Sequence, residues 1–326
     1  MEFLYFLEKL RNPVCDFIFS AATRLGEETA FLVVAILVFW CINKRSGYFI
    51  MVTGFFGMMI NQFMKLIFRV PRPWVNDARF TIVESARAEA TGYSFPSGHT
   101  QMAVGTYGAI ALSFRKRWVM ISALTVAAVV AFSRMYLGVH TTWDVMASVG
   151  IAVILLLVLE PLFLNERLFN KVMPYLAPGL AVAAAGFFIY ARIAYSKRLG
   201  NVNFENGLRS ACMLLGCALG FVLTYFLDSK IIRFKTEAKW YSQIFKLVLG
   251  LAFVILLKEL LKLAFVPLFG VYYERILRYF IVVAFAGCVW PLNFNFFSRI
   301  EIPVLDRFSE KVKGLLLRRK SDTDKA

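Results

Sequence analysis

Three polar clusters lie between residues 65 and 144, and each one borders a long apolar run. Together they contain both histidines of the chain. The clusters consist of Lys65, Arg72 and Pro73; of Pro96, Ser97, Gly98 and His99; and of Ser133, Arg134, His140 and Asp144. Cations, a helix start, imidazoles and a carboxylate are the groups that bind a phosphate and transfer a phosphoryl group. The spacing of these residues therefore predicts phosphoryl-transfer chemistry.

The sequence around Ser97 predicts the start of a helix that can bind an anion. Ser97 can cap the first turn, and Gly98 permits close approach to the backbone. The free N–H groups of that turn favour negative charge. Lys65 and Arg72 lie beside prolines at which the preceding apolar run must stop. Each cation alone could be an interfacial side chain, but together with Arg134 three of them are expected to meet one helix start.

His140 and Asp144 predict a nucleophile and the carboxylate that orients it. They are four residues apart, which is about one turn of a helix. A carboxylate on one ring nitrogen fixes the tautomer and leaves the other nitrogen unprotonated and nucleophilic. His99 is then the candidate to protonate the leaving oxygen.

The three clusters together resemble the signature of the type 2 phosphatidic acid phosphatase (PAP2) superfamily. The resemblance implies that His140 accepts the phosphoryl group covalently, that Asp144 orients it, and that His99 acts as general acid and later activates water. It also implies that no metal or other cofactor is needed. The phosphate-binding residues that it implies are Lys65, Arg72, Ser97, Gly98 and Arg134.

The composition indicates the elements that must position these residues. Of 326 residues, 59% are hydrophobic and 33 are phenylalanine, which is more apolar side chain than a soluble domain can bury. The net charge of +16 fits cytoplasmic anchoring and an anionic substrate, and no nucleic-acid partner is expected. The five cysteines are scattered and are expected to be free thiols.

We expect an all-α, polytopic membrane helix bundle, because only helices suit these runs. The predicted spans are 29–43, 47–68, 99–114, 118–136, 143–164, 176–195, 207–227, 243–268 and 276–297. The expected parts are an N-terminal interfacial segment (1–28), a six-span PAP2-like catalytic core (29–195), about three additional transmembrane spans (196–297) and a basic cytoplasmic tail (298–326). The connection 74–95 is expected to be a lid, a rim for lipid entry or an interfacial loop.

In an up-and-down bundle the three clusters lie on one side of the membrane. Basic residues gather in the short loops of the other side, at 44–45, 115–117 and 230–239. Such loops mark the cytoplasm, so the active site is expected to face outward in a bacterial plasma membrane. The connection 192–209, with four basic residues, counts against this orientation.

The expected function is a metal-independent phosphatase that removes phosphate from a membrane lipid phosphate through a phosphohistidine. The expected partners are the phosphorylated lipid and membrane lipids. Alternatives are a polyprenyl (undecaprenyl) diphosphate phosphatase and a sugar-phosphate phosphatase of the glucose-6-phosphatase type. A transporter or flippase would have no use for a His–Asp pair at a helix start, and an inactive scaffold would lack a catalytic residue.

Overall fold

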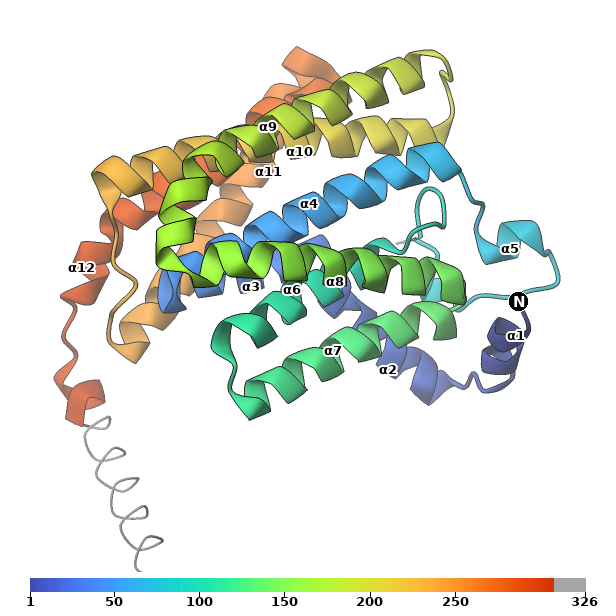
Figure 1. Cartoon of the computed structure of the whole chain (residues 1–326), viewed down its shortest axis with the longest axis horizontal. Helices are drawn as coiled ribbons and strands as arrows, with labels where there is room; N and C mark the ends of the chain where they lie inside the picture. The colour runs from blue at the N-terminus through green and yellow to red at the C-terminus, as the bar shows by residue number, and fades with distance from the viewer. Residues whose placement is uncertain (89, 308–326) are drawn as a thin grey trace, which may run out of the picture.

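The computed structural model describes residues 1–88 and 90–307, and within these ranges it contains helices and no β-strand (Figure 1). The expected all-α fold is confirmed. The α-helices are α1 (Glu2–Lys9), α2 (Pro13–Thr23), α3 (Glu28–Leu37), α4 (Lys44–Phe68), α5 (Pro73–Asn76), α6 (Gly98–Phe114), α7 (Arg117–Tyr136), α8 (Thr142–Leu164), α9 (Glu166–Ser196), α10 (Val202–Leu227), α11 (Trp240–Ala284) and α12 (Phe294–Ser298). Shorter 3₁₀ or π turns are η1 (Arg24–Gly26), η2 (Val38–Ile42), η3 (Glu84–Ala86), η4 (Asp228–Ile232), η5 (Phe285–Val289) and η6 (Trp290–Asn293).

Helix α4 lies between two groups of helices (Figure 1). On one side it contacts α6 and α8, and α6 also packs along α7. On the other side it contacts α9 and α10, and α10 packs against α11. The ends of α4 and α7 and the starts of α6 and α8 therefore meet at one end of the bundle, which is where the sequence clusters were expected.

Local sequence explains where these helices begin and end. The backbone of Arg69 adopts a left-handed conformation with φ 52°, which closes α4 before the prolines at 71 and 73. Ser97 caps α6. Thr141 and Asp144 form a capping box at the start of α8.

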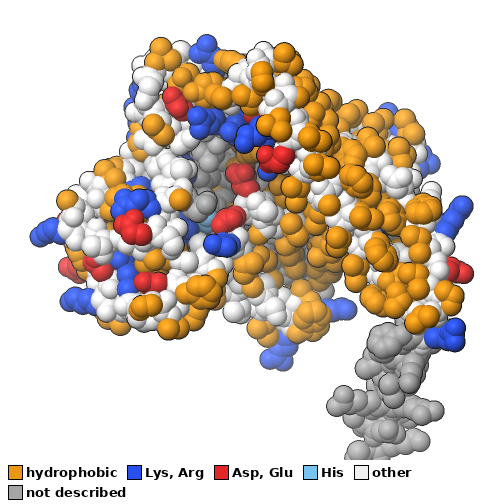
Figure 2. Space-filling model, turned by 180° about the vertical axis from the view of Figure 1, so that it is seen from behind, with side chains coloured by type: hydrophobic (Ala, Val, Ile, Leu, Met, Phe, Trp, Pro, Cys, Tyr) orange, Lys and Arg blue, Asp and Glu red, His pale blue; other side chains and the backbone are white. Residues whose placement is uncertain are grey.

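Within the described residues, five helical segments are long and apolar enough to cross a membrane. They are Lys44–Asn76, Arg117–Tyr136, Thr142–Leu164, Glu166–Ser196 and Val202–Ile232. A sixth is possible if the pair Pro13–Gly26 and Glu28–Ile42, bent by 54°, is one broken span. Large hydrophobic side chains such as Phe17 and Trp143 are exposed, and hydrophobic residues cover much of the face seen in Figure 2. The protein is therefore a multi-pass membrane helix bundle.

The count of nine spans is not confirmed, although helix covers every predicted range. Helix α6 has only 17 residues. The predicted spans 243–268 and 276–297 fall on α11, on the turns η5 and η6, and on α12. Within α11 two helices meet at a kink at Gly270, where φ is 72°, so this kink lies between the two predicted ranges. The division into parts stays a prediction, and most of the basic tail, residues 308–326, lies outside the described residues.

The N-terminal segment packs on the protein. Leu4 and Leu7 of α1 are buried, and Leu4 clusters with Phe80 and Ile82 of the 74–95 connection. The Tyr5 hydroxyl donates a hydrogen bond to Asp77 Oδ2 at 2.6 Å. Residues 1–28, expected as an interfacial segment, thus also hold the connection beside the site, and α2 packs along α7. All five cysteines are free thiols, as expected.

Candidate active site

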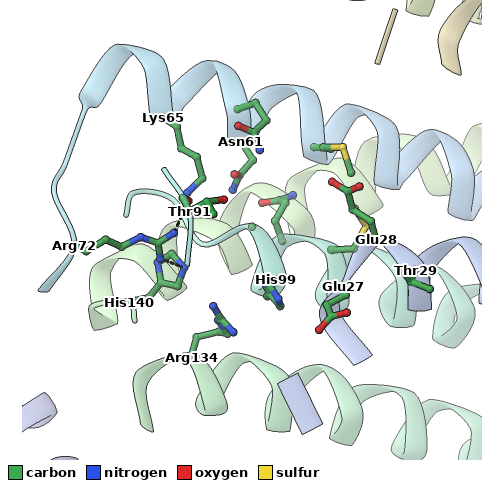
Figure 3. Close-up of a pocket in the computed structure, with 16 residues that line it drawn as sticks. Glu27, Glu28, Thr29, Asn61, Lys65, Arg72, Thr91, His99, Arg134 and His140 are labelled. Carbon is green, nitrogen blue, oxygen red and sulfur yellow. Dashed lines mark hydrogen bonds between the residues drawn. The ribbon is translucent and has the colours of Figure 1, made fainter. Parts of the chain in front are cut away.

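A cavity of about 350 Å³ opens where the three sequence clusters meet (Figure 3). Six of the eight predicted site residues line it, namely Lys65, Arg72, Gly98, His99, Arg134 and His140. Ser97 and Asp144 lie behind this lining. The structure therefore brings the predicted residues together from the end of α4, the start of α6, the end of α7 and the turn before α8.

His140 lies in the turn between α7 and α8, and Arg72 contacts its ring. The backbone at Gly138 has φ 79°, and the His140 N–H donates to the Arg134 carbonyl at 3.2 Å. Arg72 Nη1 lies 2.9 Å from His140 Nε2. Because a guanidinium only donates hydrogen bonds, Nε2 must be the acceptor, and the ring proton of the neutral imidazole is on Nδ1. Burial and the nearby cations, Arg72 first, lower the pKa of His140 well below its usual value, which favours this neutral form.

Asp144 lies behind His140, and Ser94 lies between them. His140 Nδ1 and Asp144 Oδ2 are 3.6 Å apart, which is too long for a hydrogen bond. Ser94 Oγ donates to Asp144 Oδ2 at 2.6 Å and lies 3.4 Å from His140 Nδ1. The same carboxylate oxygen accepts the Thr141 N–H at 2.7 Å. The carboxylate thus reaches the imidazole mainly through Ser94, a residue that sequence reasoning missed.

Lys65 and Arg72 are fixed by backbone carbonyls of the segment 91–93. Arg72 donates to Thr91 O at 2.8 Å, to Gly92 O at 3.1 Å and also to Val139 O at 2.9 Å. Lys65 Nζ donates to Tyr93 O. These carbonyls hold both cations at the cavity and offset the cost of burying them. No sequence signal marked this segment, because any residue can supply a carbonyl.

The start of α6 is built as a helix cap. Ser97 Oγ accepts the Thr100 N–H at 3.4 Å and lies 2.9 Å from Thr100 Oγ1. The Ser97 N–H donates to Asp144 O at 3.1 Å, and Ser148 Oγ donates to Ser97 O at 2.8 Å. The Ser97 side chain therefore caps the helix, whereas Gly98 exposes its backbone at the cavity.

His99 and Arg134 line the cavity opposite Arg72 and Lys65 (Figure 3). His99 Nε2 is buried and has no hydrogen-bond partner among the residues that the structure describes. Arg134 is 1% exposed, and its Nη1 donates to Thr23 Oγ1 of α2 at 2.7 Å. The N-terminal helices therefore help to position a predicted site residue.

Further polar side chains line the cavity that the sequence reasoning did not select. Asn61 Nδ2 donates to Pro96 O at 3.2 Å, and Asn61 Oδ1 and both polar atoms of Gln101 lack hydrogen-bond partners among the described residues. Glu27 and Glu28 lie on the same wall. A polar residue inside an apolar helix was the available signal for Asn61 and Gln101. No group of three or more His, Cys, Asp or Glu side chains within 1–88 and 90–307 is arranged to hold a metal ion.

Comparison with protein families places this site in a known domain. Residues 46–168 match the PAP2 superfamily, and residues 212–300 match the transmembrane extension of PAP2 superfamily phosphatases. All eight predicted site residues lie within the first match. The chain thus contains a PAP2 superfamily domain followed by the PAP2 transmembrane extension, as the sequence motifs predicted.

Similar curated proteins are phosphatases. Sphingosine-1-phosphate phosphatase 1 of Rattus norvegicus is 24% identical over 279 residues, covering 80% of this chain and 63% of its own length. Undecaprenyl-diphosphatase BcrC of Bacillus subtilis is 35% identical over 104 residues, 32% of this chain and 51% of its own. Phosphatidylglycerophosphatase B of the same species is 26% identical over 157 residues, 45% of this chain and 74% of its own. The chain spans less than two thirds of the matched sphingosine-1-phosphate phosphatase, and no solved structure is significantly similar.

Proposed function

We propose that this chain, which contains a PAP2 superfamily domain, is a phosphatase that removes phosphate from a membrane lipid phosphate through a phosphohistidine at His140, without a metal. The observation that carries the proposal is the contact of Arg72 Nη1 with His140 Nε2 at 2.9 Å inside a cavity lined by three cations. It supports a neutral imidazole whose Nε2 lone pair faces the phosphate site.

In the first step His140 Nε2 attacks the phosphorus atom, and the bond from phosphorus to the lipid oxygen breaks. His99, in its protonated form, gives its proton to that oxygen, so the lipid alcohol leaves neutral. The guanidinium of Arg72 exchanges its contact with Nε2 for a phosphate oxygen. Ser94 and Asp144 stabilise the Nδ1 proton while the ring gains positive charge.

In the second step water attacks the phosphohistidine. His99, now neutral, takes a proton from the water as the phosphorus–nitrogen bond breaks, and inorganic phosphate leaves. Lys65, Arg72 and Arg134 offset the negative charge on the phosphoryl oxygens in both steps. Together with the N–H groups at the start of α6, they provide the electrostatic stabilisation that bound cations give other phosphoryl-transfer enzymes.

A lipid is the substrate class that the position of the site supports best. The cavity lies at one end of a membrane bundle, and Figure 2 shows basic and acidic side chains around a hollow bordered by hydrophobic surface. A lipid can enter such a hollow with its tails still in the bilayer. The matched relatives are named for sphingosine-1-phosphate, undecaprenyl diphosphate and phosphatidylglycerophosphate, which are lipids. A lipid diphosphate is a second candidate, because a further polar cavity adjoins the first.

Phosphate release from a substrate panel in detergent tests this function. The panel contains phosphatidate, phosphatidylglycerophosphate, a sphingoid phosphate, undecaprenyl diphosphate and glucose 6-phosphate. We expect turnover of at least one lipid in EDTA, inhibition by vanadate, and a kcat/KM for the water-soluble sugar phosphate at least roughly tenfold lower. His140→Ala is the control for contaminating activity. Activity that disappears with chelator and returns with Mg²⁺, or equal kcat/KM for glucose 6-phosphate and the lipids, would contradict the proposal.

A further inference from the structure

A second polar cavity of about 270 Å³ adjoins the phosphate site. Four residues line both cavities, namely Glu28, Gln62, Lys65 and Thr91. Lys65 therefore presents its charged side chain to both spaces. A substrate group next to the phosphate in the first cavity can reach the second without leaving the protein.

The far wall of the second cavity belongs to the C-terminal helices α10 and α11. It consists of Asn203, Asn206, Arg209 and Ser210 of α10 and of Arg275 of α11. The α10 residues follow a spacing of three and four, so they share one face of a helix that is otherwise apolar enough to span a membrane. Polar and charged side chains at such a position are costly and commonly mark a binding site or pathway.

The two arginines of this wall are only loosely paired. Arg209 Nη2 lies 3.7 Å from Glu205, and its buried Nε has no hydrogen-bond partner among the described residues. Arg275 Nε donates to the Val271 carbonyl at 3.3 Å and lies 3.9 Å from Glu274 Oε1. That carboxylate already accepts two hydrogen bonds from Arg278, at 2.7 and 2.8 Å. The charges of Arg209 and Arg275 therefore remain available to a ligand, unlike that of Arg278.

The charges around the second cavity favour an anion. Lys65, Arg209 and Arg275 carry positive charge, and Glu28 is the single carboxylate among the described residues that line the cavity. Amide groups of Asn203 and Asn206 add hydrogen-bond donors. Such a set of arginine forks and amides suits a phosphate group.

We propose that Arg209 and Arg275 form a second anion subsite, which binds a second phosphate of the lipid substrate while the terminal phosphate occupies the first cavity. The inference rests on the proposed phosphatase function and gives α10 and α11 a role in substrate selection. A lipid diphosphate is the substrate class that fills both subsites. Arg209 and Arg275 are specificity-determining residues in this account, since they bind the group that is not transferred.

Paired substrates with one hydrocarbon chain test the subsite. Farnesyl diphosphate and farnesyl monophosphate are compared in detergent with the double variant Arg209→Gln/Arg275→Gln. Loss of two charge-assisted contacts should lower kcat/KM for the diphosphate about 10- to 100-fold, mainly through KM. The monophosphate should change by less than about threefold, since it needs only the first cavity. Arg299→Gln is the matched control, because Arg299 is an exposed arginine directly after α12, at the other end of the bundle (Figure 1).

Equal effects on both substrates, or no effect on either, would overturn the subsite. A preference for an amine-bearing lipid phosphate that is lost in Glu28→Gln would also overturn it, because the second cavity would then select a cation. Binding of methylenediphosphonate, followed as a shift in melting temperature, is the readout that does not depend on turnover. It should be weakened by the double variant and not by the control. If neither lipid is hydrolysed but this binding difference is found, the proposed function fails and the subsite stands.

Discussion

At the scale of single residues, the two ring nitrogens of His140 have different neighbours, as the proposed attack by Nε2 on the phosphorus atom requires. Arg72 contacts Nε2, and Ser94 connects Nδ1 with Asp144. Asp144 also caps α8 together with Thr141, so one carboxylate fixes the helix start and polarises the imidazole. A change at Asp144 would mix both effects, whereas Ser94 allows them to be separated.

Ser94→Ala should lower kcat about 10- to 100-fold, because one hydrogen bond to a charged group is lost next to the nucleophile. The melting temperature should change little more than in Ser85→Ala, a serine that hydrogen-bonds to Ser20 at the surface. Steady-state kinetics and thermal unfolding check this. If Ser94 acts through His140, the pH profile of kcat/KM should shift in Ser94→Ala and stay unchanged in Ser85→Ala. A lower melting temperature with wild-type kinetics would show that Ser94 is only structural.

The low pKa of His140 predicts how activity depends on pH. Because the pKa of His140 is lowered, its imidazole stays neutral at pH 6.5, the usual pKa of histidine, and at somewhat lower pH. Nε2 therefore remains nucleophilic at pH 6.5, and the enzyme loses activity only at lower pH. Measurement of kcat/KM between pH 5 and 8, corrected for ionisation of the substrate phosphate, checks this. The prediction would be contradicted if acidification from pH 8 already removed half of the activity at pH 6.5 or above and the loss belonged to the enzyme rather than to the substrate.

The sequence predicted the charged residues of the site but not their supports. Lys65, Arg72 and His140 could be selected because few residue types perform their chemistry and because their spacing is informative. The carbonyls at 91–93 could not, since their position depends on the path of a loop. Ser94 was missed for the same reason, because its contact with Asp144 joins residues that are 50 positions apart.

At the scale of elements, the bend between α2 and α3 supports the start of α6. Gly26 lies at this bend, and a Cβ added there would be 2.8 Å from the His99 carbonyl and 2.7 Å from Val130 Cγ1. Neither contact can be accommodated without a shift of α6 or α7. The helix that carries His99 is therefore positioned by the N-terminal segment.

Gly26→Ala should destabilise the protein by about 1–3 kcal/mol and lower kcat, because overpacking at the bend displaces His99. Gly150→Ala is the matched control, since a Cβ at this α8 glycine meets nothing within 4 Å. That control should be neutral or slightly stabilising. Thermal unfolding and steady-state kinetics of both variants test this prediction. A Gly26→Ala variant with the melting temperature and kcat of the wild type would show that the bend does not position His99.

Helical ranges were easier to predict from the sequence than the contacts between helices. Apolar runs such as 118–136 and 143–164 match α7 and α8 closely, since long runs in a membrane protein form helices. Residues 1–28 were expected to be an interfacial segment, and their contact with the 74–95 connection was not predicted. The predicted boundary between spans 243–268 and 276–297 lies beside Gly270, where the backbone leaves the helical conformation and α11 is kinked.

At the scale of the whole molecule, the ends of the described chain lie at opposite ends of the bundle. The N-terminus lies at the end with the active site, whereas α12 lies at the other end (Figure 1). Basic residues at 44–45 and 115–117 lie at the same end as α12, in the turns before α4 and α7. The basic residues of these two turns favour an orientation with the active site outward, whereas those of 192–209 count against it, so the outward orientation stays a prediction.

Reporter fusions at the two termini test this orientation. A reporter at the N-terminus should be active only outside the cell, and one after Ala326 only in the cytoplasm. Arg117→Gln, at the start of α7, should leave both results unchanged, because several other basic residues remain on that side. Both termini on the same side would rule out an odd number of spans.

The covalent intermediate is the central claim, and rapid-quench labelling with a radioactive phosphorylated lipid tests it most directly. We expect wild-type enzyme to carry label transiently and His99→Ala to retain it, because only proton delivery and water activation are lost. His140→Ala should carry no label and show no turnover, a loss of several orders of magnitude. Label that persists on His140→Ala, or turnover by that variant, would contradict the account.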